Sequence, residues 1–127
     1  MELVRETLHL KGSGYSVDDR LREIGYGHWE GLTLPEMERH DATTFAARSL
    51  DKWGVAAPSG ESYASVTLRM RDWYEQLLVD TVTVAHGGTM RALMVALAIA
   101  TPDEAAETLI GQGVVYVFRD GRLTKHG

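Results

Sequence analysis

Residues 81–100 read TVTVAHGGTMRALMVALAIA, which is a β-branched segment, a histidine, two glycines and an apolar run. The segment 81–85 predicts a short buried strand, and the run up to Ala100 predicts a buried helix. A strand, a glycine-rich turn and a helix in succession present backbone N–H groups to an anion. The helix start and the imidazole of His86 then converge on one small volume, which suits a phosphoryl group. A tight turn with a hydrogen-bonded histidine explains the same residues.

Composition restricts the protein to a few classes. The 127 residues, of which 44% are hydrophobic, suffice for one domain or part of one. The net charge of −5 and the lack of any basic run argue against a nucleic-acid surface or an anionic-membrane footprint. The absence of cysteine excludes disulfide scaffolds, zinc–thiolate sites and thiol nucleophiles. We expect a cytoplasmic protein from the lack of cysteine, although a cysteine-free protein fits any compartment. The longest apolar run, 92–100, is well below the ~20 residues that span a bilayer.

Capping residues and turn formers divide the rest of the chain. Glycines at three of the seven positions 25–31 predict a loop with close backbone approach. The segments 114–118 and 123–124 predict a hairpin around Asp120-Gly121. Helices are predicted over 2–10 and over 35–40, the second capped by Thr33. Another helix is predicted to begin at Asp41 or Thr43 and to end at Leu50. A long helix from Glu61 and one or two turns from Pro102 follow. The core face of the long helix is predicted to carry Tyr63, Val66, Met70, Trp73, Leu77 and Leu78.

Two other segments could carry chemistry. Glu23 precedes the glycine-rich loop and could serve as a proton donor, although a loop glutamate is often only a solvated charge. His28 lies in the same loop and could line the same site as Glu23. The segment 58–64 resembles a loosened nucleophile elbow around Ser62, which would indicate a serine hydrolase. However, no strand precedes it, and Ser59 as a helix cap explains the same residues.

No metal site is predicted, because no two of the five histidines have a metal-ligand spacing. We expect no cofactor either.

The order of the motifs is informative. Residues 22–31 read REIGYGHWEG, residues 60–62 read GES, and residues 85–88 read AHGG, with Arg91-Ala92-Leu93 after them. This succession resembles the histidine phosphatase superfamily, in its phosphoglycerate-mutase-like branch, over nearly the whole chain. The resemblance implies a three-layer α/β/α sandwich with a mostly parallel sheet. It also implies a phosphatase or phosphomutase that acts on phosphomonoesters through a phosphohistidine.

The resemblance assigns roles to individual residues. Glu23 matches the family's proton donor, which protonates the leaving alcohol and later helps to activate water. His86 matches the second pocket histidine, which stabilises the transferred phosphoryl group, and Gly87 would add a backbone N–H. Supporting roles near the site would fall to Glu61, Ser62, Arg91 and His28.

The family's nucleophile is a histidine in an N-terminal Arg-His-Gly motif, and these 127 residues contain no Arg-His-Gly. We therefore expect a single partial domain over 1–127 that lacks the N-terminal strand or strands. The chain alone should be inactive, because no covalent intermediate can form.

A non-catalytic domain that binds phosphate compounds or a partner protein remains an alternative, and a serine hydrolase built on Ser62 is a remote one. The expected partners are a phosphorylated small molecule or phosphate ion. A second copy of the chain is expected to cover the sheet edge left by the missing strand.

Overall fold

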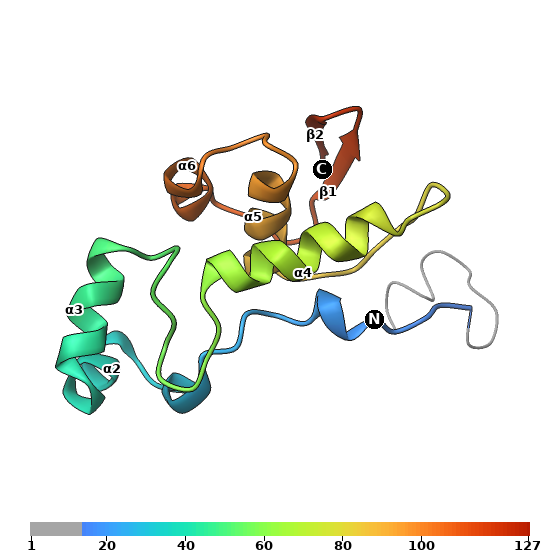
Figure 1. Ribbon diagram of the computed structural model, residues 1–127. Coiled ribbons are helices and arrows are strands. Elements are labelled where there is room, and N and C mark those ends of the chain that lie inside the picture. The colour runs from blue at the N-terminus through green and yellow to red at the C-terminus, as the bar shows by residue number, and fades with distance from the viewer. Residues whose placement is uncertain (1–13) are drawn as a thin grey trace.

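The computed structural model describes residues 14–127, and the predicted helix over 2–10 lies outside them. Figure 1 shows one long central helix, α4, with a coil along one side and shorter elements along the other. The helices are α2 (Leu34–His40), α3 (Ala42–Leu50), α4 (Tyr63–Glu75), α5 (Gly87–Ala96) and α6 (Pro102–Glu107). The 3₁₀ turns η1 (Asp19–Leu21) and η2 (Gly27–Trp29) precede them, and strands β1 (Val115–Arg119) and β2 (Arg122–His126) follow.

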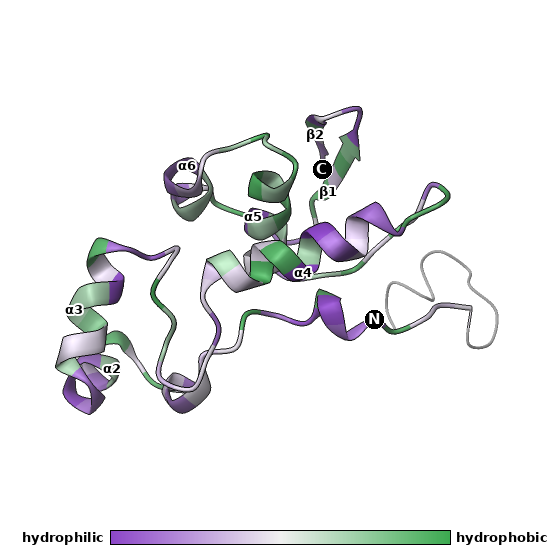
Figure 2. Ribbon diagram, viewed as in Figure 1, coloured by the Kyte–Doolittle hydropathy of each residue, from purple (hydrophilic) through white to green (hydrophobic). Residues whose placement is uncertain are grey.

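The core lies where α5 packs against α4. The predicted apolar stripe of α4 is buried over its first three turns, but Leu78 beyond the helix is 94% exposed. α5 contributes small and branched apolar side chains to the same cluster, and its apolar colouring stands out in Figure 2. Burial of such side chains stabilises the pair by about 25 cal/mol per Å² of apolar surface. The buried members of this cluster are Ile24, Tyr63, Val66, Met70, Trp73, Ala92 and Leu93.

The smaller helices begin where their caps predict. Thr33 and Glu36 form a capping box at α2, and the carboxylate of Asp41 accepts the Thr44 N–H at the start of α3, 3.0 Å away. α2 packs on α3, and α6 packs on α5. The predicted hairpin is confirmed, with Phe118 opposite Leu123 in the antiparallel pair.

Within residues 14–127, no helix has the length and apolarity needed to cross a bilayer.

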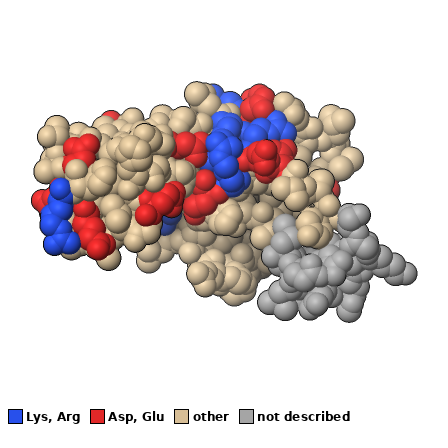
Figure 3. All heavy atoms as spheres, turned by 90° about the horizontal axis from the view of Figure 1, so that it is seen from below, with Lys and Arg blue, Asp and Glu red and all other residues tan. Residues whose placement is uncertain are grey.

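The coil before residue 26 is attached to α4 by ion pairs. The guanidinium of Arg20 donates to Asp72 at 2.6 Å and to Gln76 at 2.9 Å, both on the last turns of α4 or just after it. Its hydrogen bonds to Asp18 also lower the pKa of that carboxyl to about 2. Figure 3 shows this face, with acidic and basic side chains gathered next to one another. The coil therefore lies along α4 on the opposite side from α6.

The segment 81–85 is not the buried strand predicted from its β-branched sequence. It has no strand partner among the described residues, and only Thr83 of its five residues is partly buried. Residues 80–85 also make no backbone–backbone hydrogen bond to another described residue. A strand exists only where a neighbouring strand supplies the ladder, so β propensity alone does not create one here.

Two further predictions need correction. The helix predicted to reach Ala100 ends at Ala96, because Leu97 leaves helical geometry and Ala98 has a φ of 54°. The cap of the long helix is Ser62, not Ser59. The described residues pair strands only in the antiparallel β1–β2 hairpin, so α and β structure are both present, but a parallel sheet is not seen among them.

Two glycine-containing loops meet backbone to backbone beside α4. The His28 N–H donates to the carbonyl of Pro58 at 2.9 Å, and a Cβ on Gly27 would lie 2.2 Å from that carbonyl. Gly27 also has a φ of +51°, a conformation that L residues rarely adopt. Gly25 tolerates a Cβ better, since its nearest neighbour would be a Glu61 oxygen at 3.6 Å.

We expect Gly27→Ala to lower the free energy of unfolding by about 2–4 kcal/mol, because the new methyl strikes fixed backbone and strains φ. The matched variant Gly25→Ala should lose less than about 1 kcal/mol, since its methyl makes only ordinary contact. Urea unfolding of the two variants measures both values. Equal losses would show that the two loops do not approach as described.

Candidate functional site

The carboxylate of Glu23 lies at the N-terminus of α5. It accepts the Gly88 N–H at 3.1 Å and the N–H of the neighbouring Ile24 at 2.9 Å, both on Oε1. Gly88 is buried, and a Cβ there would lie 2.3 Å from the same oxygen. Only glycine at this position lets the carboxylate approach the helix start, where the helix dipole favours a negative charge. Two motifs 65 positions apart are thus joined.

His86 is the residue that precedes α5, and its backbone is extended, with a φ of −123° and a ψ of 166°. Its N–H donates to the hydroxyl of the buried Thr89 at 3.1 Å, and that hydroxyl donates back to the His86 carbonyl at 2.9 Å. His86 itself is exposed, and it forms a capping box with Thr89 at the start of α5. His86 therefore lies at the helix start, two residues before the Gly88 N–H that the Glu23 carboxylate accepts.

Glu61 lies on the other side of the Glu23 loop. Its Oε2 accepts the Gly25 N–H at 3.0 Å, and its own N–H donates to the Gly25 carbonyl at 2.8 Å. The Arg69 guanidinium binds both carboxylate oxygens at 3.0 Å, and Arg22 reaches Oε1 at 3.2 Å. Burial disfavours the charged form, but the donors from Arg69 and Gly25 outweigh it and lower the pKa of Glu61. Glu61 therefore stays ionised as a structural anchor.

An aromatic pair, the buried Tyr63 and the partly buried Trp53, lies at the start of α4. The Tyr63 ring stacks on Trp53, with centroids 4.9 Å apart and planes 16° apart. Burial raises the pKa of the Tyr63 hydroxyl, an effect that Tyr26 strengthens and Arg91 opposes. Arg91 also donates from Nε to the Thr108 carbonyl at 3.0 Å, which ties α5 to the segment after α6. Arg91 therefore lies behind the helix start as a structural contact.

Two predicted site residues have other surroundings. The Ser62 hydroxyl accepts the Ser65 N–H at 3.1 Å and caps α4, and its other hydrogen bond is to the Ser65 hydroxyl. The His28 ring lies against the ring of His40 on α2, with centroids 6.0 Å apart in an edge-on arrangement. The structure therefore joins Glu23 to Gly88, two residues after His86, but it places His28 beside α2.

Sequence reasoning missed Gly88 and Arg69 as parts of the site. Gly88 follows the predicted site residue Gly87. The two glycines differ in that the Glu23 carboxylate contacts Gly88 and not Gly87. Arg69 lies eight residues after Glu61, which is about two turns in the helix predicted from Glu61, although α4 begins at Tyr63. That spacing is the signal by which Arg69 could have been found.

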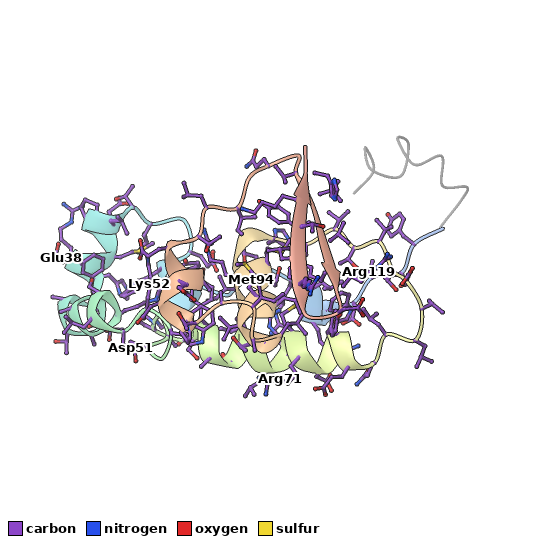
Figure 4. All side chains as sticks on the ribbon, turned by 90° about the horizontal axis from the view of Figure 1, so that it is seen from above. Glu38, Asp51, Lys52, Arg71, Met94 and Arg119 are labelled. Carbon is purple, nitrogen blue, oxygen red and sulfur yellow. The ribbon has the colours of Figure 1, made fainter. Side chains whose placement is uncertain are left out.

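Two hollows on the described surface lie away from the start of α5. One lies over the hairpin and is lined by Val117, Arg119 and Thr124 among others, and the other lies between the end of α3 and α6. Figure 4 shows Asp51 and Lys52 beside the second hollow, and Arg119 on the hairpin. No cluster of acidic or histidine side chains suited to a metal ion occurs within residues 14–127.

The helix start combines three groups that act on a phosphoryl ester. Free N–H groups and the helix dipole attract an anion, an imidazole can donate to its oxygens, and a carboxyl group can supply a proton. The Glu23 carboxylate occupies the Gly88 N–H that an anion could otherwise use.

We expect Gly88→Ala to destabilise the fold by about 1–2 kcal/mol, because its methyl displaces the Glu23 carboxylate from the helix start. Gly87→Ala is the matched control, since its methyl would lie no closer than 3.5 Å to a neighbour, the Arg91 Nη1. That variant should be unchanged or slightly more stable, because alanine favours the helix. Thermal unfolding of both decides, and equal stabilities would contradict the close approach of Glu23.

Comparison with known proteins finds relatives that match most of the chain. A 2,3-bisphosphoglycerate-dependent phosphoglycerate mutase of Azorhizobium caulinodans is 26% identical over 131 residues, 94% of this chain and 62% of that protein. A 6-phosphofructo-2-kinase/fructose-2,6-bisphosphatase 1 of Rattus norvegicus is 28% identical over 106 residues, 82% of this chain and 22% of that protein. An uncharacterized protein of Mycobacterium bovis is 32% identical over 104 residues, 79% of this chain and 26% of that protein.

The chain spans less than two thirds of the length of each of these relatives. The model of the histidine phosphatase superfamily (branch 1) matches residues 2–122, which is nearly the whole chain. The chain therefore belongs to the histidine phosphatase superfamily.

Proposed function

We propose that residues 1–127 supply the proton-donor and phosphate-binding half of a phosphatase or phosphomutase site for phosphomonoesters. The observation that carries this proposal is the Glu23 carboxylate on the Gly88 N–H at the start of α5, next to His86. A carboxyl group, an imidazole and a helix start at one point match the needs of phosphoryl transfer.

Each group has one task in the proposed reaction. Glu23 gives a proton to the oxygen of the leaving alcohol as the bond to phosphorus breaks, and it later takes a proton from the attacking water. The His86 ring and the Gly87 N–H donate to the phosphoryl oxygens while negative charge develops on them. Arg91, Glu61 and Ser62 hold the helices and loop that carry these groups.

The proposed reaction passes through a phosphohistidine, and its nucleophile comes from outside these 127 residues, which contain no Arg-His-Gly. Without an attacking imidazole the chain binds phosphate compounds but does not turn them over. A phosphate-binding domain without catalysis is the second candidate, and the exposed ring of His86 supports it equally. A hydrolase built on Ser62 has less support, since that hydroxyl caps α4.

We further propose that the complete domain is a three-layer α/β/α sandwich with a mostly parallel sheet. Residues 81–85 would form one of its strands once a neighbouring strand pairs with them. Their β-branched sequence, their unpaired backbone and their position directly before α5 support this proposal.

The 127-residue chain should bind orthovanadate, which mimics a phosphoryl group, without hydrolysing p-nitrophenyl phosphate above a buffer control. His86→Ala should weaken vanadate binding by at least about tenfold, because a donor to the anion is lost. His28→Ala is the control, since the His28 ring lies against His40. Isothermal titration calorimetry measures vanadate binding, and the release of p-nitrophenol measures hydrolysis.

Equal vanadate binding by the His86→Ala variant and the unchanged chain would contradict the proposed site. Turnover that survives purification and disappears in His86→Ala would show that this chain holds its own nucleophile.

We propose that a second copy covers the surface around residues 78–84 when the chain is alone. Leu78 and Val82 are 94% and 82% exposed there, and the backbone of residues 80–85 is unpaired among the described residues. Apolar surface beside unpaired backbone favours association. Light scattering across a tenfold dilution series should give a dimer or larger mass, and a mass that stays near 14.0 kDa would contradict the proposal.

A further inference from the structure

We infer that Arg69 is a positioning residue. It holds the loop that carries Glu23 in the position from which the Glu23 carboxylate reaches the start of α5. The inference rests on the proposed function, because it concerns the group assigned as proton donor. The contacts that support it are on α4 and in the loop, away from any reacting atoms.

The Arg69 guanidinium contacts the backbone of the loop at Glu23 and three residues before it. Arg69 donates from Nη1 to the backbone carbonyl of Arg20 and from Nη2 to the carbonyl of Glu23 itself at 3.4 Å. The same group binds the Glu61 carboxylate with Nε and Nη2, each at 3.0 Å. Its side chain is only 12% exposed, so these bonds are largely shielded from water.

Glu61 extends this hold to the far end of the loop. It receives the Gly25 N–H and returns its own N–H to the Gly25 carbonyl, so Gly25 is fixed in both directions. Arg69 therefore reaches the backbone before Glu23 directly and the backbone after it through Glu61. The backbone of the loop between these points cannot shift away from α5 without breaking one of these bonds.

The helices transmit this position to the site. Arg69 lies between the buried residues Val66 and Met70 on α4, the helix against which α5 packs. The packing of α5 on α4 thus fixes the distance between the Glu23 loop, which Arg69 holds, and the start of α5. By comparison, the Arg22 side chain is 58% exposed and reaches Glu61 at 3.2 Å from the solvent side. An exposed pair of that kind contributes little.

The planar fork of arginine is required here. Two nitrogens bind the carboxylate side by side while the third points to the backbone carbonyl. A lysine would keep the charge but could not make these three contacts together.

Hydrogen exchange of the ligand-free chain tests the inference. The Gly88 amide donates to Glu23, so its exchange rate reports whether the carboxylate is in place. In Arg69→Met, and also in Arg69→Lys, the Gly88 amide should exchange at least about tenfold faster, while the Ala92 and Leu93 amides within α5 stay protected. Arg71→Met is the matched control, because Arg71 points from the same helix away from the molecule (Figure 4).

Gly88 exchange in Arg69→Met that stays within about twofold of the unchanged chain would overturn the inference. Faster exchange throughout α5 would also overturn it, since that shows a general structural role. If Arg69→Met does not fold, Glu61→Gln serves instead, with the same expected and contradicting results. Vanadate affinity is measured separately, so loss of the proposed function leaves the exchange result decisive for Arg69.

Discussion

The packing of α5 against α4 is the contact on which the rest of the molecule depends. It buries the aromatic and aliphatic face of α4 and fixes the start of α5 relative to the loop that α4 holds. Glu23 and Gly88 are 65 positions apart in the sequence, and the packing of α5 on α4 brings them together in space. The candidate site is therefore a product of helix packing, and its distances follow from which side chains fill the core.

Two carboxylates of neighbouring segments have different surroundings. Glu61 is bound by two arginines and a backbone N–H, which lower its pKa, whereas the Glu23 carboxylate accepts only backbone N–H groups among the described residues. The lowered pKa means that Glu61 stabilises the fold at neutral pH and that this contribution is lost as the pH falls through the folded-state pKa. The arrangement makes Glu61 the anchor of the loop and leaves the Glu23 carboxylate at the start of α5.

Local signals were predictable from the sequence, and contacts across the chain were not. The caps of α2 and α3 depend on side chains within three residues, so Thr33 and Asp41 were sufficient to predict them. The segment 81–85 has the composition of a strand, but strand formation depends on a partner that its own sequence does not specify. The role of Arg69 was hidden because the carbonyl that it binds is 49 positions away. The family resemblance, not composition, assigned Glu23 and His86 to one site, and the structure places the Glu23 carboxylate on the Gly88 N–H.

The central claim is that Glu23 and the start of α5 form one anion-responsive site. Titration of ¹⁵N-labelled chain with inorganic phosphate tests it most directly, since each backbone amide reports separately. We predict that the amides of Ile24, Gly87 and Gly88 shift together along one saturable curve, because phosphate competes with the Glu23 carboxylate for the helix start. Shifts that spread over the hairpin or α3, or that never saturate, would contradict it.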